Sequence, residues 1–417
     1  MKENKTLEFK SDMTNSFLKT VSAYANYGSG AIEFGRRDDG SIQGIKNPTQ
    51  FCIDVETKIN DSIHPKPDYS LEVDRKNKLV ILSVNEGRYK PYLYKGKAYR
   101  RSDTASVEVD QMDLKRLTLE GSNLYFEDLP CEDKALSFTI LESKLVEKLG
   151  ISKLTDDMLR TFGFFSEEKK YNIAASLFAD KNSFPGIDYA VFGKSINEIL
   201  DRNTFSGCSV LKQYDDIISV FRRNYKYEQI VGMERQEIER IPEAAFREAI
   251  ANALVHRTWD INSHIKISMF EDKIEIASPG GLPKGLTKEE YLRGNISNLR
   301  NPIIGNLFFR MNYIEMFGTG IRRINETYAD YANKPIFEIF DNSVLVTLPT
   351  TTTDYKATND EKRLLTLLYK GIILSRTEIA EALGWSKDKT IRTLNGLKKS
   401  GYIESHGSGR STRYKRH

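Results

Sequence analysis

The stretch Phe246–His256 constrains the fold most, because it carries two helical patterns at once. Its apolar residues recur at the i, i+3, i+4, i+7, i+8 spacing of a helix that turns one face to a core. Glu248, Asn252 and His256 are each four residues apart, so on the same helix they form one polar stripe. A carboxylate, an amide and an imidazole on one edge of a packed helix can position water, hydrated Mg²⁺ and phosphate oxygens. The alternative is a helix face that only meets solvent.

A hairpin is predicted directly after this helix. Two runs with strand patterning, Ile265–Phe270 and Lys273–Ala277, flank a short turn and lead into Ser278–Pro283. The paired Gly280 and Gly281 of that segment let backbone approach a ligand closely. We therefore expect a ligand contact where the second strand of the hairpin ends.

Two further segments complete the pattern of a ligand site. Residues 284–298 mix glycine, asparagine and charge without a sustained apolar period, which is typical of a lid-like loop. Gly318, Thr319 and Gly320 then precede a helix whose first residues, Ile321–Ile324, include two arginines. Free N–H groups and basic side chains at such a helix start would face an anion. A single Gly-x-Gly is more often a turn than a phosphate cradle, so the prediction depends on all these segments together.

In this order the motifs resemble the ATP-binding domain shared by gyrase B subunits, mismatch-repair ATPases and histidine kinases, the GHKL superfamily. They are most similar to its divergent branch in bacterial proteins labelled RecG-like, which reads REAxxNAxxHR, NPGGLP, RNP and GTGIxRI. The corresponding segments here are Arg247–Arg257, Ser278–Pro283, Arg300–Pro302 and Gly318–Ile324. The resemblance covers about residues 170–350 and implies a GHKL-like α/β sandwich.

The resemblance also implies roles for single residues. Asn252 would coordinate Mg²⁺, Glu248 would be the ATPase base that activates the attacking water, and the glycines would border the nucleotide. Two departures favour nucleotide binding over fast hydrolysis: Ser278-Pro279 stands where the superfamily usually has an aspartate for adenine, and Thr258 replaces the usual tyrosine after the histidine-arginine pair. The implied ATP-binding residues are Asn252, His256, Gly280, Gly281, Arg300, Gly318, Thr319 and Gly320.

The C-terminal segment follows a polar linker, Pro349–Asp354, and is rich in basic residues. From Arg376 to His417 there are ten Lys and Arg against four Asp and Glu, an excess suited to a polyanion. Apolar spacing predicts three helices and then two paired strands, the order of a winged helix-turn-helix. The expected elements are helices over Asp360–Lys370, Arg376–Leu383 and Lys387–Ser400 and strands over Gly401–Ser405 and Ser411–Lys415.

A winged helix would place its third helix in the major groove of duplex DNA and its wing along the phosphates. Winged helices also serve as protein-docking or dimerisation modules, which is the alternative. The residues expected to face DNA are Lys387, Lys389, Thr390, Arg392, Thr393 and Lys398 on the third helix and Arg410 and Arg413 in the wing.

The N-terminal end forms a different unit. Its pattern predicts a helix over Asn15–Asn26 and several short strands. The expected strands are Thr6–Lys10, Ala31–Gly35, Ile42–Ile45, Tyr69–Val73, Leu79–Val84 and Lys97–Arg100.

Five short motifs in this unit resemble the AlbA_2 domain, which bacterial regulators share with Schlafen proteins. They are Glu8–Lys10, Ser22–Asn26, Gly28–Gly30, Asp38–Ile45 and Tyr99–Ser102. The resemblance implies either nucleic-acid binding or metal-dependent RNA cleavage.

The cleavage alternative depends on three carboxylates that would hold divalent ions on a phosphodiester. Glu3 and Glu8 have the E-x4-E-F-K spacing of Schlafen nucleases, and the third carboxylate would be Asp38 or Asp39. The family's Gly-Val-Asp reads Gly-Arg-Arg here, which puts Arg37 where a ligand is expected. Surface carboxylates without a metal are the favoured interpretation.

Length and composition bound the remaining possibilities. A chain of 417 residues is long enough for about three domains. No apolar run approaches a membrane span and the N-terminus has no secretory core, so we expect a cytoplasmic protein. Cys52, Cys131 and Cys208 lack metal-ligand spacing and are expected to be buried thiols.

These observations predict an α+β protein of three parts: an AlbA_2 domain over residues 1–120, a connector and GHKL-like domain over 121–350, and a winged helix over 355–417. The predicted function is an ATP-binding, DNA-binding transcriptional regulator, with duplex DNA at the C-terminal domain and RNA as a further partner of the N-terminal domain. The first alternative is a Schlafen-like endoribonuclease in phage defence, controlled by the other two domains. The second is an assembly protein with a purely structural ATP fold. Because GHKL domains and winged helices often dimerise, we expect a homo-oligomer.

Overall fold

The computed structural model divides into two compact units, Met1–Leu129 and Pro130–His417. No helix in the part of the chain that the structure describes is both long and apolar enough to cross a membrane. The free thiols of Cys52, Cys131 and Cys208 are half-buried, less than the sequence led us to expect. The described residues are 2–133, 135–166, 169–231, 234–283, 285–294, 298–331, 333–351, 358–368, 372–399, 402–407 and 412–416.

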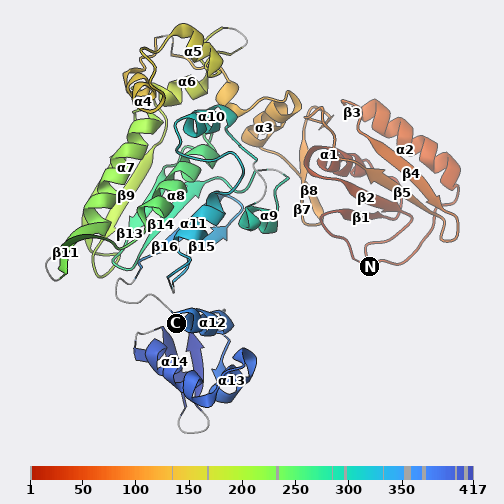
Figure 1. Ribbon diagram of the computed structural model, residues 1–417. Helices are drawn as coiled ribbons and strands as arrows, with labels where there is room; N and C mark the ends of the chain where they lie inside the picture. The colour runs from red at the N-terminus through yellow and green to blue at the C-terminus, as the bar shows by residue number, and fades with distance from the viewer. Residues whose placement is uncertain are drawn as a thin grey trace. The chain divides into compact units, whose positions relative to one another are not determined.

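The first unit is built on one four-stranded sheet and two long helices. The strands are β1 (Leu7–Lys10), β2 (Gly30–Phe34), β4 (Tyr69–Asp74) and β5 (Leu79–Val84), and the helices are α1 (Phe17–Tyr27) and α2 (Pro48–Ser62). The sheet order is β1-β2-β5-β4, with β1 and β2 parallel and the other neighbours antiparallel (Figure 1).

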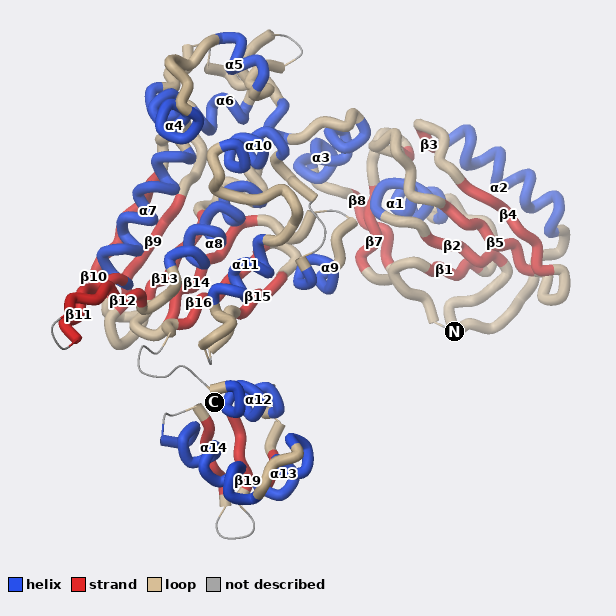
Figure 2. The backbone as a smooth tube through the Cα atoms, viewed as in Figure 1, coloured by secondary structure: helices blue, strands red, loops and turns tan. Residues whose placement is uncertain are grey.

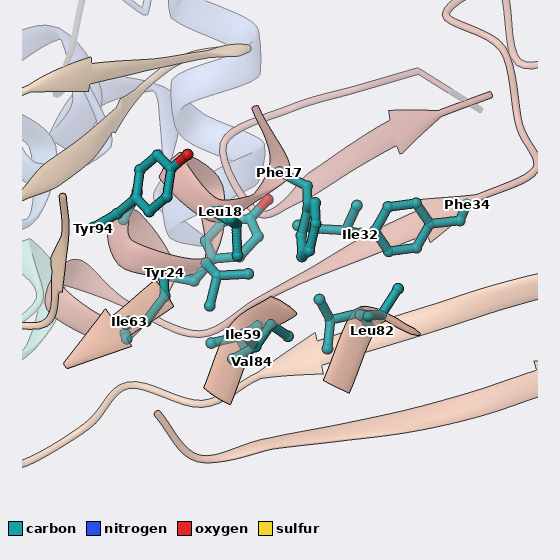
Figure 3. Packing of buried hydrophobic residues seen from close by; sticks show 14 of the residues in the cluster. Phe17, Leu18, Tyr24, Ile32, Phe34, Ile59, Ile63, Leu82, Val84 and Tyr94 are labelled. Carbon is teal, nitrogen blue, oxygen red and sulfur yellow. The ribbon is translucent and has the colours of Figure 1, made fainter. Parts of the chain in front are cut away.

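Aromatic and branched side chains from both layers form the core of this unit (Figure 3). Phe17 and Tyr24 of α1 meet Ile32 and Phe34 of β2, and all four are buried. The rings of Phe17 and Phe34 pack edge to face with centroids 5.4 Å apart. Burial of one face of α1 thus fixes the helix against the sheet.

The expected strand over Ile42–Ile45 does not form, and that prediction is wrong. Both edges of β2 are already paired, one with β1 and the other with β5. Only an isolated bridge joins Arg36 to Ile42. The remaining elements of the unit are β3 (Ile63–His64) paired with β6 (Leu93–Tyr94), β7 (Tyr99–Ser102) paired with β8 (Ala105–Glu108), α3 (Gln111–Gly121) and a 3-10 turn, η1 (Phe126–Asp128).

The second unit contains a six-stranded sheet in the order β10-β9-β13-β14-β16-β15. The helices α7, α8 and α11 lie along one face of it (Figures 1 and 2). The strands are β9 (Ile187–Phe192), β10 (Ile199–Phe205), β13 (Ile265–Met269), β14 (Lys273–Pro279), β15 (Ile336–Ile339) and β16 (Ser343–Pro349), and a separate hairpin is formed by β11 (Lys226–Val231) and β12 (Glu234–Glu239). The helices are α7 (Val210–Tyr225), α8 (Glu243–His256), α9 (Lys288–Arg293), α10 (Pro302–Arg310) and α11 (Gly320–Thr327).

The predicted hairpin is confirmed, because β13 pairs with β14 in antiparallel register. The lid-like stretch differs from the expectation: its described part contains α9, which begins with a capping box between Thr287 and Glu290 and ends at Gly294 in the left-handed region. A strong local cap therefore forms a helix where apolar periodicity gave no sign of one.

A small helical layer precedes the sheet of the second unit. It consists of α4 (Thr139–Leu149), α5 (Asp156–Thr161) and α6 (Ile173–Phe178). The first of these helices begins at Thr139. Its start is capped by Asp180, whose carboxylate accepts hydrogen bonds from the backbone N–H groups of Thr139 and Ile140, both at 2.9 Å. Such a long-range cap leaves no local signal in the sequence.

The C-terminal module has its own small core. Leu364, Ile379, Leu394 and Leu397 are buried in it, and Trp385 packs with them. The three predicted helices and the two predicted strands form, and one additional short strand completes a sheet in the order β17-β19-β18. The elements are α12 (Asn359–Leu367), β17 (Leu374–Ser375), α13 (Arg376–Leu383), α14 (Lys387–Lys399), β18 (Ile403–His406) and β19 (Arg413–Arg416).

Candidate functional site

The helix α8 presents its polar stripe to a pocket. All the apolar positions predicted to face the core are buried, so the opposite edge of the helix is fixed in place. On that edge Glu248 is buried, and Asn252 and His256 line the pocket. The structure therefore excludes the alternative in which this edge only meets solvent.

The pocket collects residues from segments that are far apart in the sequence. It contains about 1030 Å³ of empty space, including its open mouth. Apolar side chains of β14, β16 and α11 form much of its wall, which suits a flat, largely apolar group such as a nucleobase. The predicted ATP-binding residues that line it are Asn252, His256, Gly280, Gly281, Gly318 and Gly320.

Gly320 is required by close packing between two helices. A Cβ atom at this position would lie 2.6 Å from Nδ2 of Asn252 and 2.7 Å from Oε1 of Glu248. Gly318, two residues earlier, has a φ of 68°, in the left-handed region that favours glycine. The Gly-x-Gly segment thus brings the start of α11 directly against the polar stripe of α8.

Gly280 and Gly281 allow a second close approach. Gly280 has a φ of 101°, and a Cβ atom there would collide with the hydroxyl of Thr258 and lie 2.6 Å from a nitrogen of Arg300. A Cβ atom at Gly281 would collide with the backbone oxygen of Asp341. Because neither residue has a Cβ atom, Thr258, Arg300 and Asp341 can pack directly against the backbone at the end of β14, where it forms part of the pocket wall.

Arg300 does not line the pocket, but its hydrogen bonds connect two segments that do. Its guanidinium donates to the backbone oxygen of His256 at 3.1 Å and of Gly281 at 2.8 Å, and also to the hydroxyl of Thr258. These bonds join the end of α8 to the glycine segment after β14. Arg300 and Thr319 are outside the set of pocket-lining residues, so their predicted ATP contacts stay predictions.

His256 is held neutral. Burial lowers the pKa of its imidazole to about 4, and the positive charge of Arg300 adds to this effect. At neutral pH the ring therefore has one N–H donor and one nitrogen acceptor for a ligand.

The carboxylate of Glu248 is buried beside two partners. The amide nitrogen of Asn252 donates to its Oε1 at 3.2 Å, and a guanidinium nitrogen of Arg323 lies 3.5 Å from its Oε2. Burial raises the pKa of Glu248, and Arg323 acts in the opposite direction. A carboxylate tuned in this way, next to a pocket, is a candidate general base.

The residues fit a Mg²⁺ ion that is held mainly by a bound polyphosphate. Because the amide nitrogen of Asn252 is turned to Glu248, its amide oxygen is the atom that can face a hydrated cation. Among the described residues, no three His, Cys, Asp or Glu side chains are grouped closely enough to hold a metal. A cation at this pocket would therefore depend on Asn252 together with ligand oxygens.

Ser278 takes the place of the adenine-reading aspartate expected in the superfamily. Its hydroxyl donates to the backbone oxygen of Ala253 at 3.1 Å, so it joins β14 to α8. Sequence reasoning did not single out Tyr291 and Asn298, which line the pocket. It expected Arg323 to face an anion, and in the structure Arg323 lies beside the carboxylate of Glu248. Only Arg323 had a local signal, because it belongs to the basic helix start after Gly320.

In the predicted carboxylate site of the first unit, the side chain of Glu8 is paired with two cationic side chains. Glu8 is 4% exposed and pairs with Arg101 at 2.5 Å and with Lys10 at 2.6 Å. Glu3 accepts a hydrogen bond from the backbone N–H of Phe9 at 2.7 Å. Asp38 is exposed, and with Glu3 and Glu8 it forms no group able to hold a metal in the described part of the unit.

The basic residues of α14 divide into two kinds. Lys387 and Arg392 are exposed. Lys398 is also exposed but donates to the hydroxyl of Ser405 at 2.6 Å, and the half-buried Lys389 pairs with Asp360 at 2.7 Å. Arg413 lies 3.6 Å from Glu378.

Two further predictions for this helix are wrong. Thr390 and Thr393 are buried, because they lie on the face that carries Leu394 and Leu397. Asn395 and Lys399 are exposed on the same helical stripe as Arg392 and were not predicted. Arg410 lies outside the described residues.

Comparison with known families matches two segments of the chain. Residues 3–110 match the family described as Schlafen, AlbA_2. Residues 262–348 match the family described as "Putative ATP-dependent DNA helicase recG C-terminal". The matched segment includes the hairpin, both glycine segments and all of β16 except its last residue. The two resemblances stated from sequence are thus confirmed for these segments.

Solved structures give two likenesses. The crystal structure of the DIP2311 protein from Corynebacterium diphtheriae covers 99% of this chain and 92% of its own, at 18% identity and a TM-score of 0.49. The solution structure of the N-terminal domain of a RecG-related protein from Nitrosomonas europaea covers 25% of this chain and 79% of its own, at 21% identity and a TM-score of 0.19. A comparison with curated proteins found no match.

Proposed function

We propose that this protein binds ATP with Mg²⁺ in the pocket between α8, α11 and the glycine segment after β14. The observation that carries the proposal is that six predicted ATP-binding residues from three separate segments line one pocket. Its apolar wall suits the adenine ring, and the start of α11 offers N–H groups to the phosphates. Asn252 would hold the Mg²⁺ ion, which neutralises phosphate charge when it is bound.

Thermal unfolding with and without Mg-ATP tests this proposal. A ligand that binds only the folded state stabilises it by RT ln(1 + [L]/Kd), about 2.7 kcal/mol at a hundredfold excess over Kd. We expect the parent chain to gain stability and Asn252→Ala to lose that gain. Asn203→Ala, an exposed change of the same chemistry on β10, is the matched control and should respond like the parent. An unshifted melting curve for the parent at saturating Mg-ATP would refute the proposal.

We further propose that the C-terminal module is a winged helix that binds duplex DNA, which makes the protein an ATP-responsive DNA-binding regulator. The support is the three-helix arrangement with a small sheet and the exposed Lys387 and Arg392 on α14. Lys389 and Lys398 lie on the same helix, although each already has a partner within the module.

Duplex binding at several salt concentrations tests this second part. Phosphate contacts release counterions, so affinity should fall steeply as salt rises, and removal of residues 355–417 should remove most of it. Arg392→Ala should reduce sequence preference, whereas Arg410→Ala should weaken all sequences alike. A truncated chain that binds duplex as tightly as the full chain would show that the DNA site lies elsewhere.

A further inference from the structure

The start of α11 marks the end of the pocket that would take the phosphates. A Cβ atom at Gly320 would lie 2.6 Å from Nδ2 of Asn252 and 2.7 Å from Oε1 of Glu248, so the two helices meet there. Asn252 is the residue proposed to hold Mg²⁺, an ion that bridges the outer phosphates of a nucleotide. No side chain caps the start of α11, and N–H groups at such a helix start attract anions. The outer phosphates would therefore lie beside the first turn of α11.

Arg323 lies in that first turn and has two loose anionic partners. Its backbone N–H donates to the oxygen of Thr319 at 2.9 Å. One guanidinium nitrogen lies 3.5 Å from Oε2 of Glu248, and another lies 3.3 Å from Oε1 of Glu315. Because hydrogen bonds between such charged groups are usually about 2.7–2.9 Å long, neither carboxylate holds the arginine tightly. The side chain of Arg323 is also 46% exposed, which gives it room to turn to a ligand.

The charges around the pocket make this arginine important for a polyphosphate. The described residues that line the pocket include no Lys or Arg, so positive charge for the outer phosphates would come from Mg²⁺ and from side chains at the rim. Glu315 lines the pocket and would repel a polyphosphate, unless a cation lies between the two. Arg323 already contacts Glu315. Glu315 and an incoming phosphate would therefore compete for the same guanidinium.

We propose that Arg323 binds the terminal phosphate of the nucleotide and makes the pocket prefer a nucleoside triphosphate over a diphosphate. This inference rests on the proposed ATP binding and adds which phosphate is recognised. An arginine suits the task, because its planar fork offers two parallel donors to the oxygens of one phosphate. Glu315 limits the preference, since it competes for the guanidinium. The protein therefore responds to the ratio of ATP to ADP.

Equilibrium binding to the full-length protein tests this inference with two nucleotides. The probes are Mg-ADP and a Mg-ATP analogue with nitrogen between its two outer phosphorus atoms, which resists hydrolysis. The parent should bind the analogue more tightly than ADP. In Arg323→Met the affinity for the analogue should fall about tenfold or more, with little change for ADP, because a hydrogen bond to a charged group is lost. Arg323→Lys should keep part of the preference, since it retains the charge without the planar fork.

Glu315→Gln should act in the opposite direction. It removes the competing carboxylate, so the affinity for the analogue should rise about twofold to fivefold and the affinity for ADP should rise less. A melting curve without nucleotide shows whether each variant is folded. If Arg323→Met does not fold, the other two variants decide the test, and a parent-like preference in both overturns the role of Arg323.

Arg202→Met is the matched control. It removes an arginine of the same unit that lies 3.6 Å from Asp188, a comparably loose pair, and neither residue is among the described residues that line the pocket. Both affinities should stay at the parent values. A parent that binds neither nucleotide refutes the proposed function itself. A parent that binds both equally, or a folded Arg323→Met chain with the parent's preference, overturns the role of Arg323.

Discussion

The two units each place a buried glutamate beside an arginine, yet the surroundings differ. Glu8 and Arg101 are 2.5 Å apart, their side chains are 5% and 4% exposed, and Lys10 occupies the other carboxylate oxygen. Glu248 and Arg323 are 3.5 Å apart, and the arginine side chain is 46% exposed at the edge of a pocket. In the first pair, both oxygens of the carboxylate are paired with buried or half-buried cations. In the second pair, the distance between the charged groups is longer, the arginine also contacts Glu315, and its side chain is accessible to a ligand.

This difference teaches that a glutamate-arginine pair does not by itself define a site. Both oxygens of Glu8 are paired with cations, and one of them also accepts a hydrogen bond from the hydroxyl of Thr20, so most of the acceptor capacity of this carboxylate is used within the protein. A carboxylate with a single loose cation partner next to a cavity keeps acceptor sites for a water in that cavity. The comparison therefore favours the pocket of the second unit as the ligand site, and it predicts different responses to mutation.

The largest expected effect is on the stability of the first unit. Glu8→Gln leaves Arg101 buried without its charge partner, which should cost about 3–5 kcal/mol of unfolding free energy. Glu108→Gln, in the exposed pair with Lys97, should cost at most about 1 kcal/mol. Calorimetry of the full chain measures both. The double variant Glu8→Gln/Arg101→Met should recover part of the loss, and a Glu8→Gln chain as stable as Glu108→Gln would break the comparison.

The next largest expected effect is on the packing of α11 against α8 beside the pocket. Gly320→Ala adds a methyl group into the contact with Asn252 and Glu248, and such overpacking should cost about 1–3 kcal/mol. Because α11 must then move away from α8, the stabilisation by Mg-ATP should also fall. Unfolding free energies with and without Mg-ATP separate the two losses. An unchanged nucleotide response would mean that the helices can separate without disturbing the site.

A third ion pair sharpens the comparison through its pH dependence. Glu243 at the start of α8 pairs with Arg222 at 2.6 Å and Lys226 at 2.8 Å. The hydrogen bond from Arg222 lowers the pKa of Glu243 from 4.5 to about 2, against the effect of burial. A lowered folded-state pKa contributes stability above the unfolded value, and this contribution is lost as pH falls from 4.5 through about 2.

Because Arg222 is half exposed, we expect this contribution to be about 1 kcal/mol. Unfolding free energies of Glu243→Gln and the parent should converge as the solution becomes acidic. If the two chains kept the same difference at every pH, the pair would not be the source of the effect.

The smallest expected effect is on RNA cleavage. Since Lys10 and Arg101 already hold Glu8, we expect the parent and Asp38→Asn to show no cleavage of a structured RNA with Mn²⁺ beyond that of a metal-free sample. Asp38 is exposed, so this substitution tests the nuclease alternative without disturbing the core. Strong Mn²⁺-dependent cutting by the parent, lost in Asp38→Asn, would reverse the comparison and favour the nuclease.

Local patterns in the sequence were sufficient for several elements. The core face of α8, the hairpin of β13 and β14 and the bounds of α13 followed from apolar spacing, turns and caps, which act between residues a few positions apart. The glycines at 280 and 318 were also singled out from sequence, as points of close backbone approach and of a helix start. The structure adds that both have a left-handed φ.

Contacts between distant segments were decided only by the tertiary structure. Glu8 and Arg101 are 93 residues apart in the sequence. Local sequence patterns therefore could not predict that Arg101 pairs with Glu8, a carboxylate that had been predicted to hold a metal. The bridge from Arg323 to Glu248 exists only because α11 packs on α8 at Gly320. The strand expected over Ile42–Ile45 was lost because β1 and β5 already occupy both edges of β2. Sequence patterns record which face of an element is apolar, whereas the partners of its polar groups depend on which elements pack together.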